Sequence, residues 1–161
     1  MHRRLSPGSA FSLRFFAYLF LCSIAFWLLS VHEHLGPVQR AIARLSTLGQ
    51  QWSGGHAVTR GDDIVIKTMV MNVSYECTGI FVYMLFVSFV LAYPASWASR
   101  LTGLAIGIPL IFAVNVFRLA TLARVVEIYP QAFFYLHEYV WQGIFTVLVL
   151  VGAISWAERS E

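Results

Sequence analysis

Four long apolar segments constrain the fold of this chain more than any other feature. They cover about residues 11–31, 78–97, 102–123 and 137–156, and each approaches the roughly 20 apolar residues that a helix needs to cross a bilayer core. Hydrophobic residues make up 58% of the 161 residues and charged residues only 12%, which excludes an ordinary soluble domain. We therefore predict an all-α, polytopic integral membrane protein with about four transmembrane helices in one membrane domain, residues 1–161.

The first apolar segment has two interpretations, an uncleaved anchor and a cleaved signal peptide. His2, Arg3 and Arg4 precede it, as basic residues precede both kinds of segment. The apolar run FFAYLFLCSIAFWLLSV is longer than a typical signal-peptide core, and the following HEHLGPVQR has no clear small-x-small cleavage site. These two observations favour an anchor that remains in the protein.

The basic N-terminus predicts a cytoplasmic start, and four spans return the C-terminus to the same side of a cell membrane. The polar stretch of residues 32–76 is then extracytoplasmic. The total count of cations does not support this orientation, because five would lie inside and six outside. We give more weight to the first span and the short loops, which dominate membrane orientation. The inner set is Arg3, Arg4, Arg14, Arg100 and Arg159, and the outer set is Arg40, Arg44, Arg60, Lys67, Arg118 and Arg124.

The extracytoplasmic stretch holds two recognisable patterns. In PVQRAIARLSTLGQQW the apolar residues Val38, Ile42, Leu45 and Leu48 recur at helical spacing. This pattern predicts an amphipathic helix that either lies on the outer membrane surface or packs on the helix bundle. IVIKTMVMNVSYE, with its alternating and β-branched residues, predicts a short extended segment that leads into Cys77.

The chain has only two cysteines, and their positions predict different roles. Cys22 lies in the middle of the first span, where a cysteine is usually a small buried apolar residue. Cys77 lies at a water-facing helix start with Glu76 beside it, and a helix N-terminus favours the thiolate. We expect the two thiols at different depths, which excludes a disulfide between them. Cys77 is thus a candidate nucleophile, although a lone interfacial cysteine is more often structural.

Arg118 gives the third span a polar character that a plain anchor lacks. A guanidinium inside a span costs at least a few kcal/mol unless it faces water, a partner or a cavity. The alternative is an interfacial arginine that extends toward water. Asn115 lies one turn earlier on the same face, so it either orients the guanidinium or holds two helices together.

His137 opens the fourth span, where an imidazole that reaches Cys77 would serve as acid and base. Glu138 is a weaker candidate for a supporting role, because adjacent helical residues point about 100° apart. His32 and His34 are too few for a metal site, so we predict neither a metal nor another cofactor. Under the predicted orientation, Cys77, Arg118 and His137 all lie at the outer face, and together they are the parts of a cysteine acyl-transfer site.

At these three points the sequence resembles the exosortase and archaeosortase family of membrane-embedded cysteine proteases and transpeptidases. The resemblance rests on ECTGI around Cys77, NVFRL around Arg118 and HEYVWQG from His137, in the family's order and approximate spacing. It covers roughly residues 75–155. The short chain is similar to the single-core forms, near the exosortase H subgroup.

The resemblance implies roles and a substrate. It implies that Cys77 is the nucleophile, His137 the general base and acid, and Arg118 the residue that stabilises or positions the reacting carbonyl. The implied substrate is a secreted protein whose C-terminal tail has a short motif, a hydrophobic span and a basic cluster. Such an enzyme would cleave near the motif at the outer face and transfer the acyl group to an acceptor or to water.

Two other classes compete with this interpretation. A four-helix thiol oxidoreductase would share the size but needs paired thiols, and the chain has no CxxC motif. In a non-catalytic assembly or binding subunit, Arg118 would pair with an acidic residue of a partner helix, and Cys77 would be dispensable. We predict no nucleic-acid binding, because the cations are scattered along span ends; membrane lipid explains the basic charge better.

Overall fold

The fold is described by a computed structural model for residues 7–67 and 69–160, so the predicted basic cluster His2, Arg3 and Arg4 lies outside the described residues. The chain is mostly helical and also contains a small sheet. In chain order the elements are α1 Pro7–Leu28, η1 Val31–His34, α2 Gly36–Trp52, β1 Val58–Arg60, β2 Asp63–Val65, β3 Val70–Asn72, η2 Tyr75–Thr78, α3 Ile80–Ala92, α4 Trp97–Ile128, η3 Pro130–Ala132, α5 Phe133–Tyr135, η4 Leu136–Val140 and α6 Trp141–Arg159.

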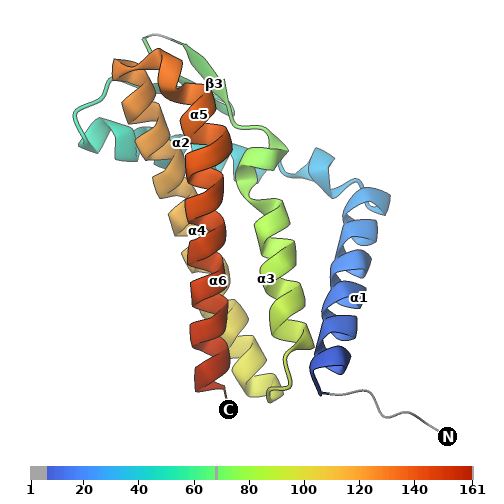
Figure 1. The fold of residues 1–161 in the computed structure, drawn as a ribbon. Coiled ribbons are helices and arrows are strands. Elements are labelled where there is room, and N and C mark those ends of the chain that lie inside the picture. The colour runs from blue at the N-terminus through green and yellow to red at the C-terminus, as the bar shows by residue number, and fades with distance from the viewer. Residues whose placement is uncertain (1–6, 68, 161) are drawn as a thin grey trace, which may run out of the picture.

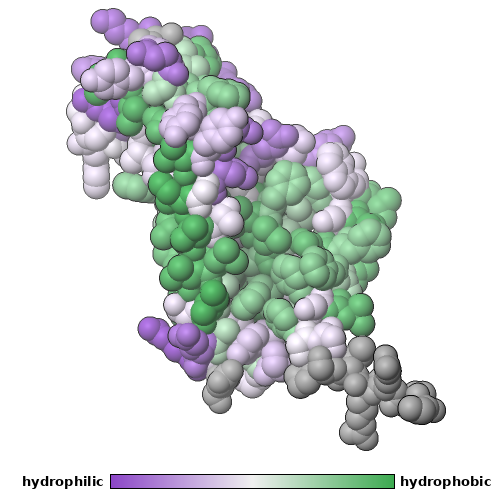
Figure 2. Space-filling model, viewed as in Figure 1, coloured by the Kyte–Doolittle hydropathy of each residue, from purple (hydrophilic) through white to green (hydrophobic). Residues whose placement is uncertain are grey.

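Helices α1, α3, α4 and α6 run side by side, with the start of α1 and the end of α6 at one end of the bundle (Figure 1). Helix α2 and the sheet lie at the opposite end. The space-filling view shows an apolar band across this face of the bundle and more polar residues above and below it (Figure 2). This is the surface expected of a bundle that is solvated by lipid along its middle and by water at its ends.

Among the described residues, three segments are long and apolar enough to cross a membrane: Gly8–Leu28 of α1, α4 and the stretch Pro130–Arg159. The predicted span 78–97 is shorter in the structure, because helix α3 has only 13 residues, or about 20 Å. Gly79 starts it with a left-handed backbone, and Tyr93 ends it in an extended conformation, as expected of a residue before a proline. Pro94 therefore ends the helix instead of bending it, and the number of full spans stays a prediction.

Helix α4 is longer than its predicted range of 102–123. Its N-terminus is capped by Ser96, whose hydroxyl accepts a hydrogen bond from the Ser99 N–H at 3.2 Å. With 32 residues the helix is about 48 Å long, more than a bilayer core requires. Its C-terminal part therefore extends beyond the apolar band, where it packs against α2 and the sheet.

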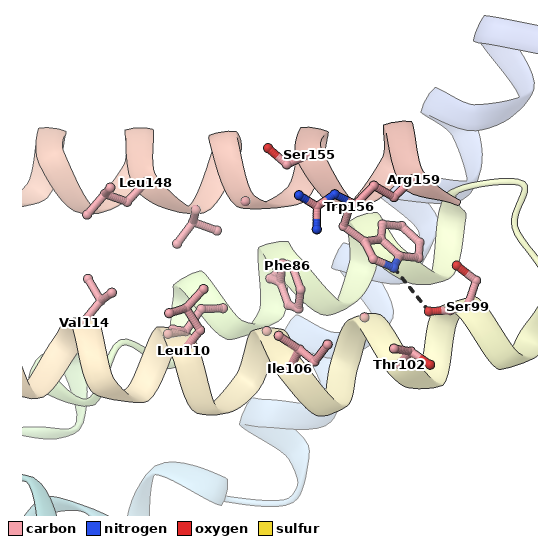
Figure 3. Close-up of a pocket in the computed structure, with 15 residues that line it drawn as sticks. Phe86, Ser99, Thr102, Ile106, Leu110, Val114, Leu148, Ser155, Trp156 and Arg159 are labelled. Carbon is pink, nitrogen blue, oxygen red and sulfur yellow. Dashed lines mark hydrogen bonds between the residues drawn. The ribbon is translucent and has the colours of Figure 1, made fainter. Parts of the chain in front are cut away.

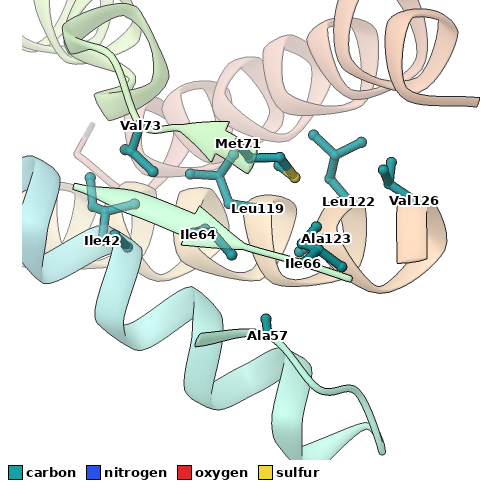
Figure 4. Close-up of a cluster of buried hydrophobic side chains, with 11 residues drawn as sticks. Ile42, Ala57, Ile64, Ile66, Met71, Val73, Leu119, Leu122, Ala123 and Val126 are labelled. Atoms are coloured by element: carbon teal, nitrogen blue, oxygen red, sulfur yellow. The ribbon is translucent and has the colours of Figure 1, made fainter. Parts of the chain in front are cut away.

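A hydrophobic core lies at that end of the molecule (Figure 4). It joins Ile42 of α2, Ile64 and Met71 of the sheet, and Leu119 and Leu122 of α4, all of them buried. The predicted helix of residues 37–52 is confirmed as α2, but its packing face differs from the predicted stripe. Ile42 is buried with Ala43, Ser46, Thr47 and Gln50, whereas Val38, Leu45 and Leu48 remain exposed. Helix α2 thus packs on the bundle and leaves an apolar edge free.

The predicted extended segment before Cys77 is part of a three-stranded antiparallel sheet in the order β1-β2-β3. Val58 pairs with Val65 across the first hairpin, and Ile64 pairs with Met71 across the second. Gly61, with φ of 67°, supplies the left-handed turn that joins β1 to β2. The all-α prediction missed this sheet because each strand has only three residues.

Buried polar groups tie α2 to the loop before the sheet, and this contact leads to a stability prediction. The Gln50 side chain accepts a hydrogen bond from the Ala57 N–H at 3.0 Å and donates one to Glu127 at 2.6 Å.

We expect Gln50→Ala to lower the free energy of unfolding by about 1–3 kcal/mol, because it leaves the buried N–H of Ala57 without a partner. Thermal unfolding of the detergent-solubilised protein measures this. Gln131 is exposed, so Gln131→Ala is the control. Equal unfolding temperatures for the two variants would contradict the expectation.

Candidate active site

Cys77 lies in η2, the short turn between strand β3 and helix α3. Its thiol is partly buried and accepts a hydrogen bond from the Ser74 hydroxyl at 3.5 Å. Gly79 follows with φ of 78°, a left-handed conformation that glycine adopts without strain, and its carbonyl accepts the first hydrogen bonds of α3. This turn lies at the start of α3, the end of that helix away from the start of α1 and the end of α6 (Figure 1).

Asn115 holds this turn against helix α4. Its side-chain amide donates a hydrogen bond to the Cys77 carbonyl at 2.9 Å, and the side chain is fully buried. Of the two roles predicted for Asn115, the contact fits the one that holds chain segments together. It fixes the backbone that carries the thiol.

Arg118 lies one turn further along α4 and is 4% exposed. Its guanidinium carbon lies 5.5 Å from the centre of the Phe145 ring of α6, a cation–π contact. The positive charge is also close enough to act electrostatically on Cys77. The predicted alternative, an arginine that extends outward to water, is inconsistent with this burial.

His137 approaches Cys77 from the segment before α6. It lies in η4, a π-helical turn of Leu136–Val140, and its ring stacks on Phe133 with centres 5.4 Å apart and planes 5° apart. The imidazole lies near enough to the Cys77 side chain to lower the pKa of that thiol, through hydrogen bonding and through its charge. Single π-helical turns inside helices occur frequently at functional sites, because they shift one side chain relative to its neighbours. Cys77, Arg118 and His137, predicted from three separate segments, thus meet in space.

Three buried polar atoms around the thiol have no hydrogen-bond partner in the described part of the chain. They are Asn115 Oδ1, Arg118 Nε and His137 Nδ1, and only two other buried side-chain atoms there share this property. Buried polar groups in folded proteins are nearly always paired. Their concentration at one place indicates a site prepared to bind a polar group, such as the amide of a peptide.

The other residues considered in the sequence do not join this cluster. Glu76 and Glu138 are both exposed, and neither side chain makes a hydrogen bond or ion pair with the described residues. Cys22 is partly buried, not fully buried as predicted, and its sulfur lies 4.0 Å from the Ser88 hydroxyl of α3. Both cysteines are free. His32 and His34 form no metal-binding group within the described residues.

Sequence reasoning missed three neighbours of the site: Ser74, Phe133 and Phe145. Ser74 precedes Cys77 by three residues, a spacing that allows contact across one turn. The two phenylalanines gave no signal, since apolar rings are expected throughout a membrane bundle. Their contacts depend on how α4 and α6 pack, which a single sequence does not reveal.

The comparison with known families agrees with the ordered motifs. The family of transmembrane exosortases (EpsH type) matches residues 5–156, nearly the whole chain and well beyond the range of the motif resemblance. This chain belongs to the transmembrane exosortase family. No curated protein and no solved structure matches it significantly. The exosortase family and the long apolar helices together make it a multi-pass membrane protein. The likeness to the exosortase H subgroup stays a prediction.

The surroundings of the exosortase thiol lower its pKa. Burial of Cys77 opposes ionisation, but hydrogen bonds from His137 and Ser74 and the charges of His137 and Arg118 outweigh it. A lowered pKa means that the thiolate is present down to a lower pH than in an ordinary cysteine, and is lost as the pH falls through that value. The site thus holds a thiol of lowered pKa, a neighbouring imidazole and a buried guanidinium.

This electrostatic arrangement predicts a pH profile for alkylation. In a protein with Cys22→Ser, we expect iodoacetamide to react with Cys77 with an apparent pKa below that of an ordinary thiol. Replacing His137 by glutamine removes the largest stabilising interaction and should move the midpoint to higher pH, while Ser74→Ala should move it in the same direction and less far. Alkylation rates measured across pH by mass spectrometry test this. An unchanged midpoint in His137→Gln would contradict the electrostatic coupling.

Proposed function

We propose that this exosortase is a cysteine protease or transpeptidase that cleaves the C-terminal sorting tails of secreted proteins through a thioester on Cys77. One observation carries the proposal: an imidazole and a buried guanidinium from two different helical segments both act on the same thiol. A thiol with a base to activate it and a cation to stabilise developing negative charge is the arrangement that acyl transfer requires.

In the first half of the reaction, the Cys77 thiolate attacks the carbonyl carbon of the scissile peptide bond, and a carbon–sulfur bond forms. The negative charge that develops on the carbonyl oxygen is stabilised by Arg118, whose Nε is without a partner in the described chain. The carbon–nitrogen bond then breaks, and protonated His137 gives its proton to the departing amine. The products are a thioester and the released tail.

In the second half, His137 takes a proton from water or from an acceptor amine, which attacks the thioester carbonyl. The carbon–sulfur bond breaks and Cys77 leaves as a thiolate, ready for another substrate. Water yields a shortened carboxylate and an amine yields a new amide. The exosortase needs no cofactor for either half, because the thiol, the imidazole and the guanidinium supply nucleophile, proton transfer and charge stabilisation.

The substrate side of the proposal follows from the position of the site. The turn η2, which carries Cys77, lies at the end of the bundle opposite the start of α1, so a cytoplasmic start of α1 would put the thiol at the extracytoplasmic face of the cell membrane (Figure 1). A secreted protein that remains anchored by a C-terminal hydrophobic segment would present its preceding motif at that depth. Anchoring in the same membrane also positions the scissile bond, which replaces a three-dimensional search by an oriented encounter.

Arg118 also separates this proposal from a non-catalytic assembly subunit. Such a subunit would turn Arg118 toward a partner's carboxylate, whereas the side chain lies inside this chain against Phe145. The lack of a second cysteine near Cys77 likewise disfavours a thiol oxidoreductase, since Cys22 is on α1 beside Ser88.

Co-expression tests the proposed function. The substrate is a secreted protein from the same genome that carries the motif, hydrophobic span and basic cluster, and its intact mass is measured with and without the native exosortase. We expect a product that has lost the tail only when the exosortase is present. A mass equal to the shortened carboxylate indicates hydrolysis, and added mass indicates transfer to an acceptor. An unchanged mass with correctly inserted protein would contradict the proposal for that substrate.

A further inference from the structure

A cavity of about 680 Å³ lies between helices α4 and α6, with Phe86 of α3 as its floor. Figure 3 shows Leu110 and Val114 along one wall and Leu148 along the other, with open space between them. Gly152 lies on the α6 wall, where a side chain would meet nothing within 4 Å. We call this cavity the α4–α6 groove. Its walls are apolar over most of their length.

The two ends of the α4–α6 groove differ in polarity. The end where α4 begins and α6 ends is lined by Ser99, Thr102, Ser155 and Arg159 (Figure 3). Trp156 closes the floor there by donating a hydrogen bond to the Ser99 carbonyl at 3.2 Å. The opposite end is lined by apolar residues. A ligand in the groove therefore has a long apolar body and a polar end near Arg159.

The apolar end of the groove leads to the candidate active site. Val114 lines it and precedes Asn115, and Leu148 lies one turn after Phe145 on α6. Phe145 and the groove floor residue Phe86 belong to the same packed cluster, and Phe145 also contacts the Arg118 guanidinium. Cys77 and His137 lie in the turns that lead into α3 and α6, and Arg118 lies on α4. The three residues therefore lie beyond the apolar end of the groove.

The length of the groove decides between two kinds of apolar ligand. Its α4 wall runs from Ser99 to Val114, which is about 22 Å along a helix. The hydrocarbon core is about 30 Å thick, so an acyl chain from one leaflet covers only about 15 Å. A lipid would leave the inner part or the outer part of the groove unfilled. A transmembrane segment would line it from end to end.

We propose that the α4–α6 groove holds the hydrophobic segment of the substrate as a transmembrane helix, with the scissile bond just beyond its N-terminal end at Cys77. This inference rests on the proposed function, because it assigns the occupant of the same site. The chain direction follows: a segment that begins at Cys77 has its C-terminus at the other end of the groove. The unpaired carbonyls of a helix C-terminus there meet the hydroxyls of Ser99, Thr102 and Ser155, and the basic cluster of the substrate lies beyond the groove in water.

Two glycines on α6 provide a matched test. Gly152 and Gly143 both have open space where a side chain would extend. They are nine residues apart, and at 100° per residue this places them on opposite faces of the helix, so only Gly152 faces the groove. We expect Gly152→Leu to lower processing of the tail-bearing substrate at least about tenfold by filling the groove. Gly143→Leu should process at the native rate, and both should retain native alkylation of Cys77. Equal processing by the two variants would overturn the proposal.

A photocrosslink measures docking without cleavage. In protein with Cys77→Ala, p-benzoylphenylalanine replaces either Leu110 in the groove or Phe16 on α1, whose exposed fractions are similar at 55% and 64%. We expect irradiation to join the substrate to position 110 and not to position 16. Lipid adducts alone at position 110, or equal substrate adducts at both positions, would overturn the groove assignment. If the native protein does not process the substrate at all, that result contradicts the proposed function instead. The two failures are therefore distinguishable.

Discussion

Replacing Cys77 by alanine is expected to abolish processing of the tail-bearing substrate, with a loss of about a thousandfold or more. Without the sulfur no thioester forms. Cys77→Ser is expected to be as inactive, because a hydroxyl is far harder to ionise than a thiol whose pKa is lowered by its neighbours. The measurement is the intact mass of the co-expressed substrate, and the membrane insertion of each variant is checked in parallel.

Cys22→Ser is the matched control for this prediction. It replaces a sulfur by an oxygen, as Cys77→Ser does, but at a residue of α1 that lies beside Ser88 and away from the candidate site. We expect native processing from this variant. Normal processing by Cys77→Ala protein would eliminate the proposed mechanism, and in that case a non-catalytic role that depends on Arg118 would explain the chain better.

Replacing Arg118 by lysine is expected to reduce processing by about a hundredfold or more, which is the usual cost of losing one oxyanion donor. Lysine keeps the positive charge but loses the planar guanidinium and its Nε, the buried donor that has no partner in the described chain. Lysine also loses the cation–π contact with Phe145. Because its ammonium group reaches less far, the positive charge lies farther from the reacting carbonyl. The rate of product formation at fixed enzyme level measures the effect.

Arg124→Lys is the control for this second prediction. Arg124 lies on the same helix but is partly exposed and pairs with Glu127 at 2.9 Å, so a lysine there should keep the contact and the processing rate. Alkylation of Cys77 in the Arg118→Lys protein shows whether the thiol turn is still folded. If both lysine variants process substrate at the native rate, Arg118 has no part in charge stabilisation.

The helical part of the fold followed from sequence where the pattern was long. Residues 37–52 formed the predicted helix, and the third and fourth apolar segments lie within long helices. The predictions were poorer where short-range chemistry decided the outcome. Gly79 and Pro94 limit α3 to 13 residues, and the sheet before Cys77 consists of strands too short to give a clear alternating pattern.

The candidate site was predicted in part for a similar reason. Cys77, Arg118 and His137 are polar residues at the ends of apolar segments, so topology alone brought them to one end of the bundle. Their contacts depend on packing that no single segment encodes, including the bond from Asn115 to the Cys77 carbonyl. Glu138 is exposed, whereas His137 beside it is partly buried, as expected for adjacent residues in a helical turn.

The most direct test of the central claim is to isolate the covalent intermediate. Native exosortase is mixed with the tail-bearing substrate in membranes, quenched with acid during turnover, digested and mapped by mass spectrometry. We predict a substrate fragment attached to Cys77 through a bond that hydroxylamine cleaves, as it cleaves a thioester. Turnover without any adduct on Cys77, or with the adduct on another residue, would contradict the assignment of Cys77 as the nucleophile.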